Sequence, residues 1–274
     1  AMSLAIDRDK LVQLAESGAG VTALHPFAPY DWFSPFEEAL QEIVARNGYD
    51  TSAHPRRVAE IMEGKGYGLD DEGMWISAAG ERVEVAMFVP QWLRAYGPPL
   101  TQQLRDAGFD ASFDTSPGLN TLVQTGKQKA SLGCKGPSGV RGMDPFLMLS
   151  IYTSQYFRPT GQPVSMWSAT SRWRNEEYDR IVERIAPLQV GDEELLELFV
   201  DAMEIWVAET PDIFLAQLII RYPCNTTRWT GWPNQDDPYG FPHSWQWELL
   251  KTLIRLEPRR DLTASVAETE SSLP

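Results

Sequence analysis

Cysteine is scarce in this sequence: its 274 residues include two, Cys134 and Cys224. No C-x-x-C pair occurs and no histidine stands near either cysteine at ligand spacing, so no zinc or other metal site is expected. The two thiols could form one disulfide or remain free, and the sequence leaves both alternatives open. The histidines, His25, His54 and His243, each stand beside a proline and are interpreted as turn or helix-cap residues.

Positive charge and long apolar runs are also scarce. Lys and Arg number 24 against 38 Asp and Glu, a formal net charge of −14 at pH 7. Such a chain repels a polyanion, so nucleic acid is not an expected partner. The longest apolar stretch, 213–220, contains Gln217 and falls far short of the roughly 20 residues that cross a bilayer. No basic segment followed by an apolar one opens the chain, so any secretory signal is expected to be absent or removed upstream of Ala1.

Spacings typical of enzymes are missing as well. Neither G-x-S-x-G nor a P-loop pattern occurs. Asp236 and Asp237 could suggest the carboxylate pair of a glycosidase, but adjacent loop residues seldom face each other across a bond to be cut. A glycoside-acting enzyme therefore stays an alternative, and we assign no catalytic residue and no cofactor.

Helix start signals recur along the chain. Asp7 and Asn175 are placed as N-caps, and Ser34, Pro35 and Glu37 fit the N-cap, N1 and N3 positions of a capping box. With the apolar spacing that follows each start, these signals predict helices over residues 8–16, 34–46, 55–64, 175–186, 192–209 and 245–256. Trp206 lies on the apolar stripe of the fifth helix and is expected in the core.

Between residues 82 and 134 the pattern alternates between strand and helix. Predicted strands lie at 82–89, 109–115 and 129–134, with helices at 97–109 and 120–125 between them. This is the βαβ rhythm of a mainly parallel, helix-covered sheet and predicts an α/β fold. Another strand is expected within 212–221, followed by a loop over 222–242.

Several segments occur together in a specific order. They read "AMSLAIDRDKLV" (1–12), "YDTSAHPRRVAEIMEGKGY" (49–67), "GMDPFLML" (142–149), "RNEEYDRIVERI" (174–185), "AETPDIFL" (208–215) and "RWTGWP" (228–233). Over most of residues 1–258 this ordered set resembles family 5 extracellular solute-binding proteins, the peptide, nickel and oligosaccharide receptors of bacterial ABC importers.

The resemblance implies a periplasmic-binding-protein-like lobe of the type II, large-ligand class, α/β, with a mixed, mainly parallel sheet covered by helices. In that family a segment like "AIDRD" lies near the middle of the chain. Residues 1–227 are therefore expected to form the second lobe, 228–258 a return segment that packs on a missing N-terminal lobe, and 259–274 a disordered tail. The implied function is binding without chemistry: two lobes close over a solute outside the cytoplasmic membrane, in the periplasm or at the cell surface, and dock on ABC permease subunits.

The kind of solute is inferred from the absence of one acidic residue. Peptide-binding members carry an Asp for the ligand's ammonium group in the loop after the strand that matches 129–134, yet no carboxylate occurs here between Gly126 and Asp144. Sugars stack on indole rings and accept from Arg, Lys and amide donors, and the chain has 10 Trp. An oligosaccharide is favoured, with an oligopeptide as the alternative. The expected contacts are Trp92 as a stacking platform, Lys135, Ser138 and Arg141 as hydrogen-bond donors, and Trp167 as a second apolar wall.

Overall fold

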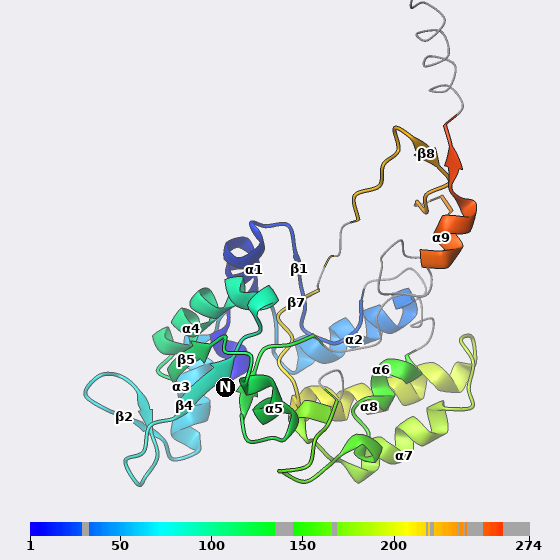
Figure 1. Cartoon of the computed structure of the whole chain (residues 1–274). Helices are drawn as coiled ribbons and strands as arrows, with labels where there is room; N and C mark the ends of the chain where they lie inside the picture. Colours follow the sequence, from blue (N-terminus) through cyan, green and yellow to red (C-terminus); the bar gives the residue numbers. More distant parts are fainter. Residues whose placement is uncertain are drawn as a thin grey trace, which may run out of the picture. The chain divides into compact units, whose positions relative to one another are not determined.

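The computed structural model in Figure 1 comprises two compact units, one of Ala1–Pro137 with Arg141–Ile219 and one of Ser138–Val140 with Ile220–Pro274. Within them, the structure describes residues 1–28, 33–134, 145–165, 169–217, 219, 222–234, 236–237, 239 and 249–259. No helix among these residues combines the length and the apolar content that a bilayer crossing requires.

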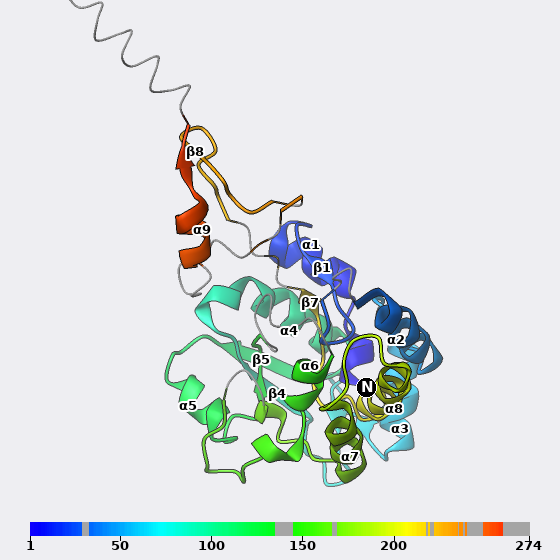
Figure 2. The same cartoon turned by 90° about the vertical axis from the view of Figure 1, so that its right-hand side faces the viewer.

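A three-stranded parallel sheet organises one part of the larger unit. β4 (Glu84–Phe88) lies between β5 (Asp110–Asp114) and β6 (Ala130–Ser131) and runs parallel to both. The chain steps from β4 outward to β5 through α4 (Gly97–Asp106), then back across β4 to β6 through α5 (Leu119–Gln124). Right-handed crossovers in opposite directions place these two helices on opposite faces of the sheet (Figure 2). The predicted βαβ arrangement is confirmed, with a shorter third strand.

Two short antiparallel sheets also belong to the larger unit. β1 (Val21–Thr22) pairs with β7 (Ala216–Gln217), and β2 (Gly68–Leu69) pairs with β3 (Trp75–Ile76). The strand expected over 212–221 is therefore reduced, within the described residues, to Ala216–Gln217. The reason lies just before it: the carbonyl oxygen of Phe214 accepts from Arg8 Nε at 2.8 Å rather than from a strand partner.

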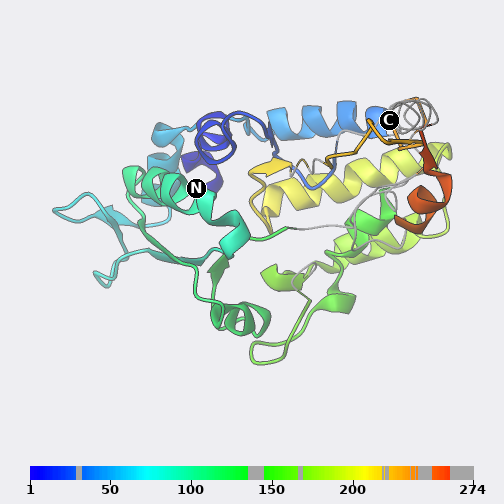
Figure 3. The ribbon, with the colours of Figure 1, turned by 45° about the horizontal axis from the view of Figure 1, so that its top comes forward.

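The other part of the larger unit is helical. α8 (Glu193–Glu209) packs against α2 (Ser34–Arg46) and α7 (Glu176–Ile185), as Figure 3 shows. Trp206 on α8 is 2% exposed, which confirms its expected place in the core. The remaining short helices of this part are α6 (Phe146–Ser150), η5 (Ser154–Tyr156) and η6 (Ala169–Ser171). The helices of this part enclose one hydrophobic core. A second hydrophobic core lies between the sheet and η1 (Met2–Ala5), α1 (Arg8–Glu16), α3 (Pro55–Gly64) and α4.

Two predicted helix caps are confirmed and one is wrong. Asp7 accepts from the backbone N–H of Lys10, and Asn175 accepts from the N–H groups of Glu177 and Tyr178. The capping box is not formed, because Ser34 is the first helical residue and Phe33 is the N-cap.

The aromatic packing at Phe33 explains the difference at α2. The ring of Phe33 is fully buried and stacks on Phe27 with 4.6 Å between the ring centroids. This packing sets where the chain enters α2, so Glu37 turns away from the N-terminus and accepts from Gln41 Nε2 instead.

The smaller unit holds a two-stranded sheet and a short helix. β8 (Trp229–Thr230) pairs antiparallel with β9 (Glu257–Pro258), and α9 (Leu249–Arg255) precedes β9. Three apolar side chains of α9 are exposed: Leu250, Leu253 and Ile254. The first residues of the predicted helix, 245–248, and the predicted tail beyond residue 259 lie outside the described residues.

Candidate functional site

The carboxyl ends of the three parallel strands meet at one edge of the sheet. Because β5 and β6 run parallel to β4, the segments that follow them, residues 89–92, 115–118 and 132–134, begin side by side. Open α/β sheets bind ligands outside the carboxyl ends of their strands. We name these three segments, together with Asp114 at the end of β5, the sheet-edge site.

Trp92 is the large aromatic side chain that this edge presents to solvent. Pro90 precedes the 3-10 helix η3 (Gln91–Tyr96), in which Leu93 and Tyr96 are buried. Trp92 is next to Leu93 in the chain but is 57% exposed. Its two buried neighbours hold η3 against the core, so the indole offers a positioned apolar face to a ligand.

Polar side chains connect the first two segments of the sheet-edge site. Gln91 Nε2 donates to Thr115 Oγ1 at 3.0 Å. One oxygen of Asp114 accepts from the backbone N–H of Ser116 at 2.8 Å and from its hydroxyl at 2.7 Å. These hydrogen bonds hold the pKa of Asp114 below its usual range, so the carboxylate is charged at neutral pH. The sheet-edge site thus contains an amide, hydroxyls, a carboxylate and an exposed indole.

Tyr96 connects this edge to α1. Its hydroxyl donates to the carboxylate of Glu16 at the end of α1. Burial, and then this hydrogen bond, raise the pKa of Tyr96 well above its ordinary value, so the phenol stays neutral. Cys134 ends the third segment, and burial raises the pKa of its thiol. Cys134 and Cys224 are each a free thiol and belong to different units.

One predicted ligand residue, Trp92, lies in the sheet-edge site. The other four, Lys135, Ser138, Arg141 and Trp167, lie outside the described residues, and their roles stay predictions. The polar residues of this edge are not among the predicted ligand residues, although each stands at or just after the end of a predicted strand: Gln91, Asp114, Thr115 and Ser116.

A separate pocket of about 400 Å³ lies beside β1 and α2. Its lining comes from β1, the residues after it, α2, the segment that follows α2, and β7, and includes no residue of the sheet-edge site. We name it the α2 pocket. Its lining residues are Val21, Thr22, Ala23, Leu24, His25, Phe27, Glu37, Gln41, Val44, Ala45, Tyr49, Asp50, Thr51 and Gln217.

Two carboxylates line the α2 pocket, and each has a histidine partner. His25 Nε2 lies 3.4 Å from Glu37 Oε1, and this hydrogen bond is the largest cause of a lowered pKa of Glu37. His54 Nε2 lies 2.8 Å from Asp50 Oδ1 and in the same way lowers the pKa of Asp50. Both carboxylates are therefore charged at neutral pH.

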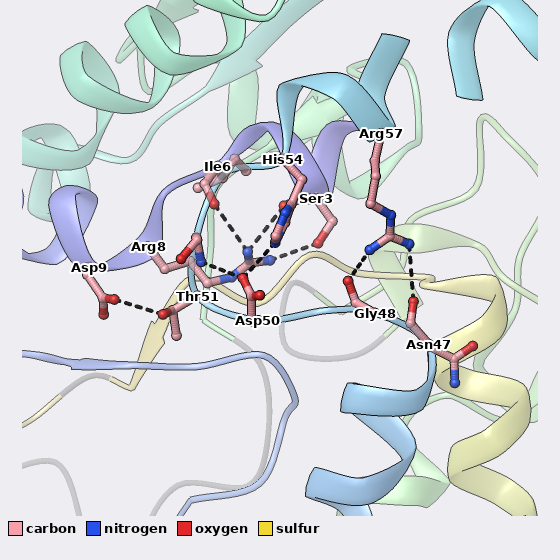
Figure 4. Close-up of polar contacts among 11 residues, drawn as sticks. Ser3, Ile6, Arg8, Asp9, Asn47, Gly48, Asp50, Thr51, His54 and Arg57 are labelled. Atoms are coloured by element: carbon pink, nitrogen blue, oxygen red, sulfur yellow. Dashed lines mark hydrogen bonds and ion pairs between the residues drawn. The ribbon is translucent and has the colours of Figure 1, made fainter. Parts of the chain in front are cut away.

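A network of polar contacts beside the pocket joins α1 to the start of α3 (Figure 4). The guanidinium of Arg8, 2% exposed, donates to Ser3 Oγ at 2.8 Å, to the carbonyl oxygen of Ser3 at 3.2 Å and to that of Phe214 at 2.8 Å. The backbone N–H of Arg8 donates to the carbonyl oxygen of Thr51, whose hydroxyl donates to Asp9. The network fixes the segment 50–54, which lines one side of the α2 pocket.

The positions of the predicted turn histidines are known for two of the three. His25 lies in a bend, and His54 is the residue before the first turn of α3, although its ring bonds Asp50 rather than the helix. His243 lies outside the described residues. In the part of the chain that the structure describes, no three His, Cys, Asp or Glu side chains are grouped closely enough to hold a metal ion.

Comparison with known proteins gives matches among solved structures. No protein-family model and no curated protein matches the sequence. A mannohexaose-bound periplasmic oligopeptide-binding protein of an ABC transporter from Thermotoga maritima is 18% identical with a TM-score of 0.75, over 94% of this chain and 48% of that chain. The oligopeptide-binding protein AppA from Bacillus subtilis, in complex with a nonapeptide, is 11% identical with a TM-score of 0.59, over 94% of this chain and 46% of that chain.

A third match adds a shorter overlap. The oligopeptide-binding protein from Thermus thermophilus, complexed with a pentapeptide, is 17% identical with a TM-score of 0.55, over 78% of this chain and 36% of that chain. This chain thus spans slightly less than half the length of the first two structures and 36% of the third. The matches confirm the predicted fold: the chain folds like part of the periplasmic solute-binding proteins of ABC transporters.

Proposed function

We propose that this chain is the second-lobe portion of the solute-binding component of an ABC import system. In this proposal, residues 1–227 form the lobe, 228–258 return to a first lobe supplied by further sequence, and 259–274 are a disordered tail. The observation that carries the proposal is the extent of the structural match: 94% of this chain aligns to 48% of a periplasmic binding protein. Binding of a solute between two lobes would then deliver it to the permease subunits.

The proposed return segment has a physical motive for packing on another surface. Leu250, Leu253 and Ile254 of α9 are exposed, and so is Trp229 of β8. Covering exposed apolar side chains removes them from water, which is the usual driving force for association. We infer that the first lobe covers them, outside the cytoplasmic membrane in the periplasm or at the cell surface.

An oligosaccharide is the proposed solute. The exposed indole of Trp92 and the amide of Gln91 in the same site suit a sugar ring, whose flat face stacks and whose hydroxyls exchange hydrogen bonds. Lys135, Ser138 and Arg141 are proposed as further donors and Trp167 as a second apolar wall. The Thermotoga maritima neighbour is described with mannohexaose bound, which agrees with this choice.

An oligopeptide is the second candidate, and one observation favours it. The charged carboxylate of Asp114 lies in the sheet-edge site and could hold an ammonium group, although the loop after β6 carries no acid before Asp144. A glycoside-acting enzyme draws no support from the neighbours, because their descriptions name binding proteins.

Calorimetric titration of this chain with mannohexaose and with an unrelated pentapeptide tests the proposal. One lobe buries only part of a ligand, so we expect weak binding of mannohexaose, with a Kd on the order of millimolar. Trp92→Ala should abolish it and leave the melting temperature unchanged, whereas Trp229→Ala, which removes an indole from the smaller unit, should keep it. Binding of the pentapeptide alone would reverse the choice of solute, and cleavage of mannohexaose would refute a receptor.

A further inference from the structure

We propose that the α2 pocket is a second binding site, separate from the sheet-edge site, for a small primary ammonium compound held by Glu37. The proposal does not depend on the solute that the sheet-edge site takes, because the two sites share no residue. It rests on the size of the pocket, on the hydrogen-bonding groups that its walls leave available, and on their charge.

The size and lining of the pocket suit a small molecule with an alkyl body. Its volume of about 400 Å³ lies in the range of roughly 300–1,000 Å³ typical of ligand pockets. Leu24, Phe27 and Val44 supply apolar contact from three different segments of its wall. Water alone gains little from such a wall, while an alkyl chain gains apolar burial.

The two side-chain amides that line the pocket offer acceptors to a ligand. The side-chain amide of Gln41 donates to Glu37 Oε1 at 3.1 Å, and that of Gln217 donates to the carbonyl oxygen of Phe27 at 2.7 Å. One N–H of each amide is thus used within the protein. The carbonyl oxygen of each amide is left to accept from a ligand.

Glu37 and His25 each have a buried polar atom that lacks a hydrogen-bond partner in the described part of the chain. Within the described residues, Glu37 Oε2 and His25 Nδ1 are both shielded from solvent and have no hydrogen-bond partner. A buried polar atom without a partner costs free energy, and native structures usually satisfy it with water, an ion or a ligand. The terminal torsion of Glu37 is soft, so Oε2 can turn toward a donor that enters the pocket.

The charge of the lining selects a cation over a neutral donor. Glu37 and Asp50 are charged, and no lysine or arginine is among the residues that line the pocket. Asp50 already faces His54 and the nearby charge of Arg8. The side-chain partners of Glu37 are the His25 ring and the amide of Gln41, which leaves Glu37 as the main counter-charge for an ammonium group.

Titration of the chain with three probes of equal length tests the site: n-butylammonium chloride, 1-butanol and sodium butyrate, followed by calorimetry and by saturation-transfer NMR. Only the ammonium compound is expected to bind. Glu37→Gln keeps the shape and removes the charge, so it should weaken binding roughly tenfold or more. Glu42→Gln removes the same charge from an exposed position of α2 outside the pocket and should leave binding unchanged.

A variant that fills the pocket tests the site without changing its charge. Ala45 lines the pocket from the helix surface, and Ala45→Leu should block binding without loss of helical circular dichroism. Equal binding of butanol or butyrate, unchanged binding by the Glu37→Gln protein, equal loss in the Glu42→Gln protein, or no binding of any probe would each overturn the proposal. Loss of mannohexaose binding at the sheet-edge site has no bearing on these outcomes.

Discussion

Replacement of Arg8 by methionine tests how the larger unit holds together. Arg8 is buried, and its guanidinium makes a hydrogen bond of 3.4 Å to the carbonyl oxygen of Ile6 and three shorter ones, to Ser3 Oγ, to the carbonyl oxygen of Ser3 and to that of Phe214. The last of these fastens the segment before β7 to the start of the chain. Methionine fills much of the same volume but donates nothing, so these carbonyl oxygens lose their donor.

Two opposing effects determine how much unfolding free energy the Arg8→Met protein loses. Three hydrogen bonds from a charged donor, at about 2 kcal/mol each, stabilise the fold by about 6 kcal/mol. Burial lowers the pKa of Arg8 from 12.5 to about 10, a cost of burying the charge of about 3 kcal/mol, and methionine avoids this cost. The Arg8→Met protein should therefore lose about 3 kcal/mol of unfolding free energy.

Urea unfolding followed by tryptophan fluorescence and circular dichroism measures this loss. Arg46→Met is the matched control, because the Arg46 side chain is 60% exposed and pairs with Glu204 at the surface. An exposed ion pair contributes about 0–1 kcal/mol, so the control should unfold near the wild-type midpoint. An Arg8→Met protein as stable as the control would refute the conclusion that the hydrogen bonds of Arg8 hold the segment before β7 in place.

Two further predictions concern α1 and its contact with η3. Ser17 ends α1 in the left-handed region, with φ of 54°, so Ser17→Gly should raise the unfolding free energy by about 0.5–1 kcal/mol, and an unchanged urea midpoint would contradict this. Tyr96→Phe should destabilise the fold at neutral pH by removing the donor to Glu16. Because the pKa of Tyr96 is raised in the folded state, the wild type should lose this advantage as the pH rises above about 10, which urea midpoints across that range would show.

Much of the fold could be predicted because its longer helices and strands show a periodic spacing of apolar residues. The amphipathic spacing of α7 and α8 and the alternation of β4, α4 and β5 correspond to the predicted segments. The two-residue strands β1, β2, β3 and β7 were missed, or were predicted too long, because two residues show no alternation. They exist through contacts with distant partners, as in the pairing of Val21 with Gln217.

The failed capping box at Ser34 shows why a local signal is not decisive. Ser34, Pro35 and Glu37 have the right identities and spacing, yet Phe33 occupies the N-cap position. Burying an aromatic ring stabilises a protein by more than the roughly 1 kcal/mol typical of one side-chain cap. The tertiary packing of Phe33 on Phe27 therefore overrides the local motif, and it is visible only once distant residues are placed.

The two sites differ in how far a sequence can reveal them. Trp92 follows a predicted strand, and the ends of parallel strands are a general place for ligands, so this residue could be found from the sequence. The α2 pocket could not, because Gln217 joins its other lining residues only through the pairing of β1 with β7. His25 was interpreted as a turn residue, which is correct for its backbone but does not reveal its contact with Glu37.

The exposure of Trp92 has a consequence for affinity. Trp206 and Trp92 are chemically identical, yet one is 2% and the other 57% exposed, so only the second can contact a solute without unfolding the core. A ligand stacked on Trp92 still faces water on its other side, whereas well-bound ligands bury roughly 70–90% of their surface. Tight binding at the sheet-edge site therefore requires a second wall, and adding a first lobe to this chain should strengthen oligosaccharide binding while leaving ammonium binding in the α2 pocket unchanged.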